Sequence, residues 1–240
     1  MRVLAKTRHD QEGIELEDTT TVLSQYIGKY LHFTSADKVG INTRAKYPGI
    51  NPIGVYGHTI TKEIINAIAH GNYSRFTNTM RSVNLYKNIF VFDFAGTVLD
   101  IRSLTLQDMK KIIDFFDKKQ QLFLSRDELV RDVKAYFVGA NGARGALEAV
   151  IEEVATNLNI NNKNLATNVI LRELGYTAIK GFISAGDPNE VCVLDPSKVV
   201  VLDKLNNPMF DDKQYQKTEE YRQYYDNIQN AAEQFSESVK

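Results

Sequence analysis

The segment Tyr30-Leu31-His32-Phe33-Thr34 is a strong β-strand candidate, because aromatic and branched side chains fit a pleated, half-buried surface. A loop rich in glycine and proline follows as far as Pro52, and Ile53–Tyr56 is predicted to be a second, short strand. Thr61 is a suitable N-cap for a helix over Lys62–His70, whose apolar residues recur on one face. The first third of the domain is therefore expected to run strand, strand, helix.

The middle of the chain has the pattern of a helical block. Thr105 with Asp108, and Ser125 with Glu128, have the spacing of capping boxes, in which a hydroxyl and a carboxylate satisfy the first free N–H groups of a helix. The helices expected from these signals and from the apolar periodicity cover residues 106–119, 126–138, 143–158 and 164–174.

Strand patterns flank this block on both sides. Asn88–Phe94 and Thr97–Ile101 precede it, and Ala95-Gly96 between them predicts a hairpin or a bulge. Three further strand candidates follow the block, namely Tyr176–Ile183, Val191–Leu194 and Lys198–Leu202. No repeat of 20–50 residues is visible, which argues against a solenoid. The order of elements predicts an α+β domain with mainly antiparallel or mixed sheets.

Composition restricts the class of protein. The chain has 240 residues, a formal charge of −1 and 43% hydrophobic residues, which is typical of one globular domain without a general affinity for nucleic acid. We expect a lead-in over residues 1–28, a domain over 29–210 with its helical block at about 105–174, and a charged helical or flexible tail over 211–240. No apolar stretch is long enough for a transmembrane helix and no signal peptide is expected, so membrane association is not predicted.

Two motifs resemble sites whose chemistry they lack. The residues from Val91 to Asp100 resemble the first motif of haloacid-dehalogenase phosphatases, but Ala95 stands where a second carboxylate would protonate the leaving group. The segment Asn141-Gly-Ala-Arg-Gly145 lacks the Gly-Lys-Ser/Thr of a P-loop. We therefore expect neither a phosphatase nor a P-loop nucleotide site.

Three short segments, in chain order, resemble the ADP-ribosyltransferase superfamily. Tyr30–Thr34 is similar to that family's first strand with its histidine, and Ile53–Tyr56 to its Gly-hydrophobic-Tyr motif. The run Asn189-Glu190-Val-Cys-Val-Leu-Asp195-Pro-Ser197-Lys-Val199 is closest to the poly(ADP-ribose) polymerase pattern. The resemblance covers roughly residues 30 to 203, and the flanking sequence is similar to transferase domains of phages and large polyvalent proteins. It implies the His-Tyr-Glu (diphtheria-toxin-like) class, with split mixed or antiparallel sheets around an NAD cleft and a helical insertion.

The resemblance implies a role for each motif residue. Glu190 would stabilise the oxocarbenium-like charge that forms when the nicotinamide–ribose bond breaks. Tyr56 would stack on nicotinamide and His32 would hydrogen-bond a ribose. Further residues expected to contact NAD are Phe33, Thr34, His58 and Tyr73. The acceptor would be a macromolecule, most simply a protein, and the site of action the cytoplasm (the host's, for a phage-encoded protein) or a virion.

The chain also departs from the family pattern. Many members carry a serine and a second stacking tyrosine on the helix after the Gly-hydrophobic-Tyr motif, and these positions are Ile64 and Ala67 here. Tyr47, Tyr73 and Phe76 are the candidates to replace the missing ring.

Two alternatives to transfer therefore stay open. They are a catalytically weak or inactive module that binds NAD, ADP-ribose or a protein, and an NAD glycohydrolase. A nucleic-acid acceptor also stays open, because basic and aromatic residues alternate over Tyr73, Arg75, Phe76, Arg81, Tyr86 and Lys87. The lone cysteine, Cys192, is expected to be a small core residue on the strand face opposite Val191 and Val193.

Overall fold

The computed structural model describes residues 19–40, 52–70, 83–139, 142–181 and 188–218. The strands are β1 (Tyr30–Thr34), β2 (Val55–Thr59), β3 (Asn88–Phe94), β4 (Val98–Asp100), β5 (Ala178–Lys180), β6 (Glu190–Val193) and β7 (Val199–Asn206). The helices are α2 (Lys62–His70), α4 (Leu106–Lys118), α5 (Arg126–Val138), α6 (Gly142–Asn157) and α7 (Lys163–Glu173). Short 3-10 turns are η1 (Val83–Leu85), η2 (Ile101–Ser103) and η3 (Pro196–Lys198), and residues 19–24 and 212–218 are also helical.

The seven strands form one mixed sheet in the order β4-β5-β6-β2-β1-β3-β7. Every pairing is antiparallel except β4 with β5, which is parallel. The expectation of an α+β domain with a mixed sheet is therefore confirmed. The described strands belong to a single hydrogen-bonded sheet, so the expected division into two sheets is not seen among them.

The sheet is strongly curled. One apolar cluster contains Val55, Phe92, Ala178, Val191 and Val193, which come from β2, β3, β5 and β6. Three strands separate β3 from β5 in the sheet order, so these side chains meet only because the sheet bends around them. The same curl lets the chain pass from β3 to β4, at nearly opposite ends of the order, within the three residues 95–97.

Of the hairpin or bulge expected around Ala95-Gly96, the hairpin is therefore wrong, and the register shift in β3 lies between Val91 and Phe92 instead. β3 pairs with β1 and β7, whereas β4 pairs with β5. Gly96 lies at the crossing with φ +129°, and a Cβ there would lie 2.1 Å from the Thr177 hydroxyl oxygen. The glycine serves this close crossing of two segments rather than a tight turn.

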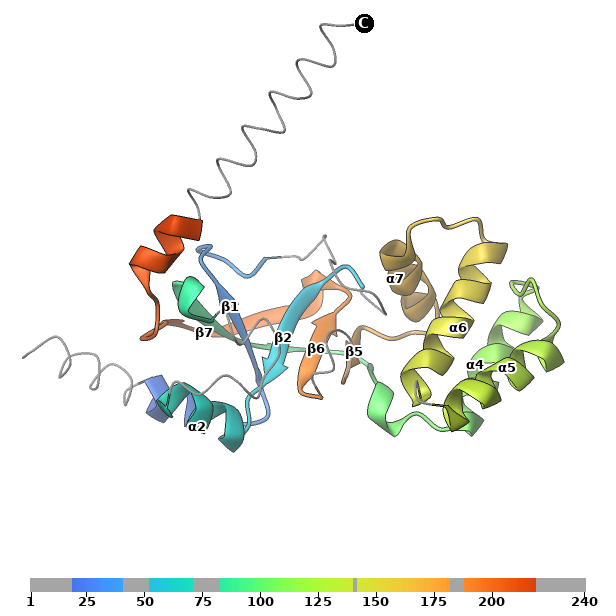
Figure 1. Ribbon diagram of the computed structural model, residues 1–240, viewed down its shortest axis with the longest axis horizontal. Helices are drawn as coiled ribbons and strands as arrows, with labels where there is room; N and C mark the ends of the chain where they lie inside the picture. Colours follow the sequence, from blue (N-terminus) through green and yellow to red (C-terminus); the bar gives the residue numbers. More distant parts are fainter. Residues whose placement is uncertain (1–18, 41–51, 71–82, 140–141, 182–187, 219–240) are drawn as a thin grey trace, which may run out of the picture.

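The helices form two groups that lie apart from each other along the sheet (Figure 1). α4 to α7 form a block that shares one core with Leu99, Ile179 and Cys192 of the sheet. α2 packs its Ile64, Ile65 and Ile68 against Leu31 and Phe33 of β1, as part of a second core. Both capping boxes are confirmed, because in each the hydroxyl accepts from the N3 backbone and the N3 carboxylate accepts from the N-cap backbone.

The first residues after β7 pack against the rest of the domain. Asp211 donates its N–H to the carbonyl of Asn84 at 2.8 Å, and the Phe210 and Tyr215 rings lie 5.5 Å apart with the Lys87 ammonium near both. The described part of the expected tail, residues 211–218, therefore contacts η1 and its surroundings. Within the described part of the chain, no helix combines the length and apolarity that spanning a membrane requires.

Candidate functional site

Three of the expected site residues share one face of the sheet. In the β2–β6 register, Tyr56 is opposite Cys192 and His58 is opposite Glu190. Directly opposed residues of paired strands point to the same face, and alternate residues along a strand do so too. Tyr56, His58, Cys192 and Glu190 therefore lie on one side of the sheet, here called the Glu190 face.

His32 belongs to the other side. The β1–β2 register places Leu31 opposite His58, so Leu31 is on the Glu190 face and its neighbour His32 is not. His32 is opposite Phe90 and shares a face with Tyr30 and Phe92, here called the Phe92 face. The prediction that His32, Tyr56 and Glu190 surround one cleft is therefore wrong for the His32 side chain. The physical reason is register: a sequence pattern assigns faces within one strand but not between strands.

His32 nevertheless holds the strand that carries Tyr56. β1 and β2 pair through Tyr30–Thr59 and Leu31–His58, and beyond them the His32 Nδ1 lies 2.7 Å from the Tyr56 carbonyl oxygen. A carbonyl only accepts, so Nδ1 carries the proton. Burial lowers the pKa of His32, the bond to the Tyr56 carbonyl opposes this, and nearby His58 lowers it further. His32 is thus neutral at pH 7, and its Nε2 is a hydrogen-bond acceptor.

Tyr56 is fixed at both ends. Its hydroxyl donates to the Pro52 carbonyl at 2.8 Å, and its ring packs against the core shared with the helical block. Burial, followed by the proximity of Cys192 and Glu190, raises the pKa of Tyr56 far above its ordinary value. The phenol therefore stays protonated.

Two glycines let β2 lie close to its neighbours. A Cβ at Gly54 would lie 2.3 Å from the Val193 carbonyl oxygen and 2.7 Å from the Cys192 sulfur. A Cβ at Gly57 would lie 2.6 Å from two ring carbons of Phe92. Gly54 belongs to the Gly-hydrophobic-Tyr motif, so the structure gives a steric reason for the glycine of that motif.

His58 and Glu190 form a polar pair in the middle of the sheet. Each is only 4% exposed, and they are opposite one another on β2 and β6. On this face, Tyr56 and Cys192 belong to the core of the helical block and Leu31 to the core under α2, so the pair lies between two apolar clusters. Ionisable groups in such surroundings require polar partners, since burying them alone is costly.

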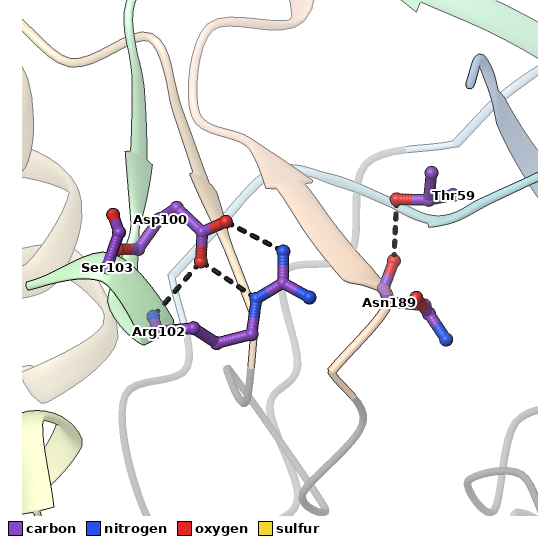
Figure 2. A network of polar contacts seen from close by, with 5 residues as sticks. All are labelled: Thr59, Asp100, Arg102, Ser103 and Asn189. Atoms are coloured by element: carbon purple, nitrogen blue, oxygen red, sulfur yellow. Dashed lines mark hydrogen bonds and ion pairs between the residues drawn. The ribbon is translucent and has the colours of Figure 1, made fainter.

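The chain beside Glu190 is held by β2. The Asn189 carbonyl accepts from the Thr59 backbone N–H at 2.8 Å and from its hydroxyl at 3.2 Å (Figure 2). These bonds extend the β2–β6 ladder by one position beyond His58 and Glu190. The start of β6 is therefore a fixed part of the sheet.

The other expected site residues have different places. Phe33 packs in the core under α2, on β1 rather than on the strands that carry Tyr56 and Glu190. Thr34 ends β1, where its Oγ1 accepts from the Ala36 N–H at 3.1 Å. Ile64 and Ala67 are buried on α2. Tyr47, Tyr73, Arg75, Phe76 and Arg81 lie outside the described residues.

Cys192 is a core residue, as predicted. It is fully buried, and burial raises the pKa of its thiol well above the ordinary value. One neighbour of the site, Asn168, had no sequence signal, since it acts over a long separation in the chain. The Asn168 side chain bonds both the N–H and the C=O of Ile53 at 2.5 Å, which ties α7 to the segment before β2.

Comparison with known proteins does not assign a family to this arrangement. No family model matches the chain, and neither the curated proteins nor the solved structures yielded a match.

Proposed function

We propose that this protein cleaves the nicotinamide–ribose bond of NAD and transfers ADP-ribose to a macromolecular acceptor, most simply a protein. The single observation that carries the proposal is the placement of Glu190 beside His58 and Tyr56 on one face of the central strands. The three ordered motifs support it from the sequence side. An ionisable group held in an apolar setting next to a specific partner is a common mark of a functional site.

The proposed chemistry needs a carboxylate and an aromatic ring on one face. Loss of nicotinamide leaves positive charge on the ribose, which Glu190 would stabilise as it forms. Tyr56, two positions from His58 on β2, would position the departing ring. The acceptor's nucleophile then attacks the sugar carbon, and its proton leaves to a base or to water.

The structure changes the expected role of the histidines. His58, not His32, is the histidine on the Glu190 face, so we assign the polar contact with Glu190 or ribose to His58. His32 becomes a positioning residue that holds the Tyr56 backbone. This assignment differs from the His-Tyr-Glu pattern, in which the motif histidine itself contacts the substrate.

A second candidate is a module that binds NAD, ADP-ribose or a protein without turnover. The observation that favours it is the burial of Ile64 and Ala67, at 0% and 7% exposure, where related enzymes carry polar and stacking side chains. NAD hydrolysis, with water as the acceptor, would use the same carboxylate.

The deciding experiment incubates the protein with NAD labelled in its adenylate part, with and without a bacterial lysate. Label on protein indicates transfer, and nicotinamide release without labelled protein indicates hydrolysis. Glu190→Gln keeps the shape but removes the charge, and should lower either rate on the order of 10²- to 10³-fold with little change in NAD affinity. Glu173→Gln, which removes a partly buried carboxylate paired with Lys119 and distant in sequence from the motifs, is the matched control and should leave the rate unchanged.

Two results would reject the enzyme. If the wild type binds NAD or ADP-ribose but releases no nicotinamide with any acceptor, the binding module is correct. If it neither binds nor cleaves NAD, both candidates fail.

A further inference from the structure

A second polar cluster lies at the end of the sheet, on the Phe92 face. Asp100 ends β4 and Lys180 ends β5, and the two are directly paired in the parallel register. Lys180 is opposite Val191 of β6, which places it and Asp100 on the side away from the Glu190 side chain. Arg102 follows in η2, and Figure 2 shows it with Asp100 near the start of β6.

Asp100 fixes one edge of the Arg102 guanidinium. Nε donates to Oδ1 at 3.0 Å and Nη2 donates to Oδ2 at 2.7 Å, while the Arg102 backbone N–H also donates to Oδ1 at 3.0 Å. A guanidinium has five N–H donors, and this pairing uses two of them. The other three have no hydrogen-bond acceptor in the part of the chain that the structure describes.

Gly181 holds the stem of Arg102 in place. A Cβ at Gly181 would lie 3.0 Å from Arg102 Cγ and Nε, so the arginine side chain rests on the glycine backbone. The Gly181 N–H donates to the Glu190 carbonyl at 2.9 Å, which anchors that backbone to β6. The position of the guanidinium is therefore set from two sides, by Asp100 and by Gly181.

Lys180 adds a second positive charge. Its ammonium lies 5.9 Å from the centre of the Tyr30 ring, and no carboxylate of the described residues is within ion-pair distance of it. Burial, followed by the charge of Arg102, lowers the pKa of Lys180, while Asp100 opposes the shift. The cluster thus holds two cations but one carboxylate, which pairs with Arg102, and it has an excess of positive charge beside an aromatic ring.

We propose that Arg102 and Lys180 form a subsite for a phosphate or diphosphate group of an anionic ligand. The outer N–H groups of a fixed guanidinium match the spacing of two phosphate oxygens, and an ammonium supplies a point charge beside them. An anion there also relieves the repulsion between the two cations. The subsite stands apart from the proposed NAD chemistry, because it uses the other face of the sheet and none of the Tyr56, His58 or Glu190 side chains.

The test measures binding of pyrophosphate, inorganic phosphate and ADP-ribose to the full chain by calorimetry. Lys180→Gln removes a charge, and should weaken pyrophosphate binding roughly tenfold, the typical effect of one charged hydrogen bond. Gly181→Ala keeps every charge but displaces the Arg102 stem, and should weaken it as well. Gly175→Ala is its matched control, since Gly175 has φ +86° like the +78° of Gly181 but no described residue within 4 Å of an added Cβ. Lys163→Gln, on α7, controls for net charge.

The outcomes separate the possible sources of the anion. Pyrophosphate and ADP-ribose binding that both variants weaken, with the controls unchanged, supports a diphosphate subsite, and equal affinity for inorganic phosphate supports a single-phosphate subsite. Failure of the wild type to bind any of the three anions overturns the proposal. So does equal weakening by Lys180→Gln and Lys163→Gln, because that result shows only a general effect of charge.

Discussion

Gly57→Ala tests the assignment of faces on which the site depends. Gly57 lies between Tyr56 and His58, and its missing side chain points to the Phe92 face. An added Cβ would lie 2.6 Å from two carbons of the Phe92 ring and 2.9 Å from the Leu31 carbonyl oxygen. Ordinary carbon contacts are about 3.5–4.0 Å, so the ring would need to move by about 1 Å.

The ring has little room for that movement. Phe92 is 0% exposed, and it packs against the Tyr30 ring with centroids 5.6 Å apart. Overpacking of a core costs about 1–3 kcal/mol, and the carbonyl on the other side places this site near the upper end, at about 3 kcal/mol. Gly40→Ala is the control, because no described residue lies within 4 Å of a Cβ there, and its free energy of unfolding should stay nearly unchanged.

The assay is urea unfolding of the Gly57→Ala and Phe92→Leu single variants and of the double variant that combines them. The smaller leucine should recover about 1 kcal/mol, seen as non-additivity in the double-mutant cycle. A loss below about 1 kcal/mol for Gly57→Ala, together with additive effects, would refute the register that puts His32 and Glu190 on opposite faces.

Three further predictions concern single side chains. The pKa of His32 is lower in the folded than in the unfolded state. Its stabilising contribution is therefore present above pH 6.5 and is lost as the pH falls below that value. His32→Gln should flatten the pH dependence of the free energy of unfolding in this range. Cys192 is fully buried, so a maleimide should label it in urea but not in the native protein, and rapid native labelling would contradict its place in the core. Asn168→Ala removes both bonds to Ile53 and should cost about 2–4 kcal/mol by thermal or urea unfolding.

Local patterns predicted the local elements well. β1, β3, α2 and α5 begin and end at the expected residues, because strand composition, caps and helical periodicity are properties of a few neighbouring residues. The second strand was expected at Ile53–Tyr56 and is found at Val55–Thr59, where Gly57, His58 and Thr59 give no apolar strand signal of their own. The pairing with β1 and β6 determines that strand instead.

The pairing of distant segments could not be predicted from these local patterns. The crossing from β3 to β4 depends on the curl of the whole sheet, and the polar cluster of Asp100, Arg102 and Lys180 depends on the parallel β4–β5 pairing across the helical block. The face of His32 depends on which residue of β2 it meets. Each of these features is set by register, which a single sequence without repeats does not reveal.

The central strands of the sheet bury two ionisable side chains. Positions 58 and 190 lie on neighbouring strands near the middle of the sheet, between two apolar cores, where valine or isoleucine would satisfy folding alone. A histidine and a glutamate there have lost hydration, and that loss is recovered only through specific polar contacts. Register further places them opposite one another, next to a tyrosine whose hydroxyl is held by the Pro52 carbonyl. The charge stabilisation proposed for Glu190 would account for two buried ionisable groups at this place, so Glu190 and His58 are the first residues to change in an assay of this protein.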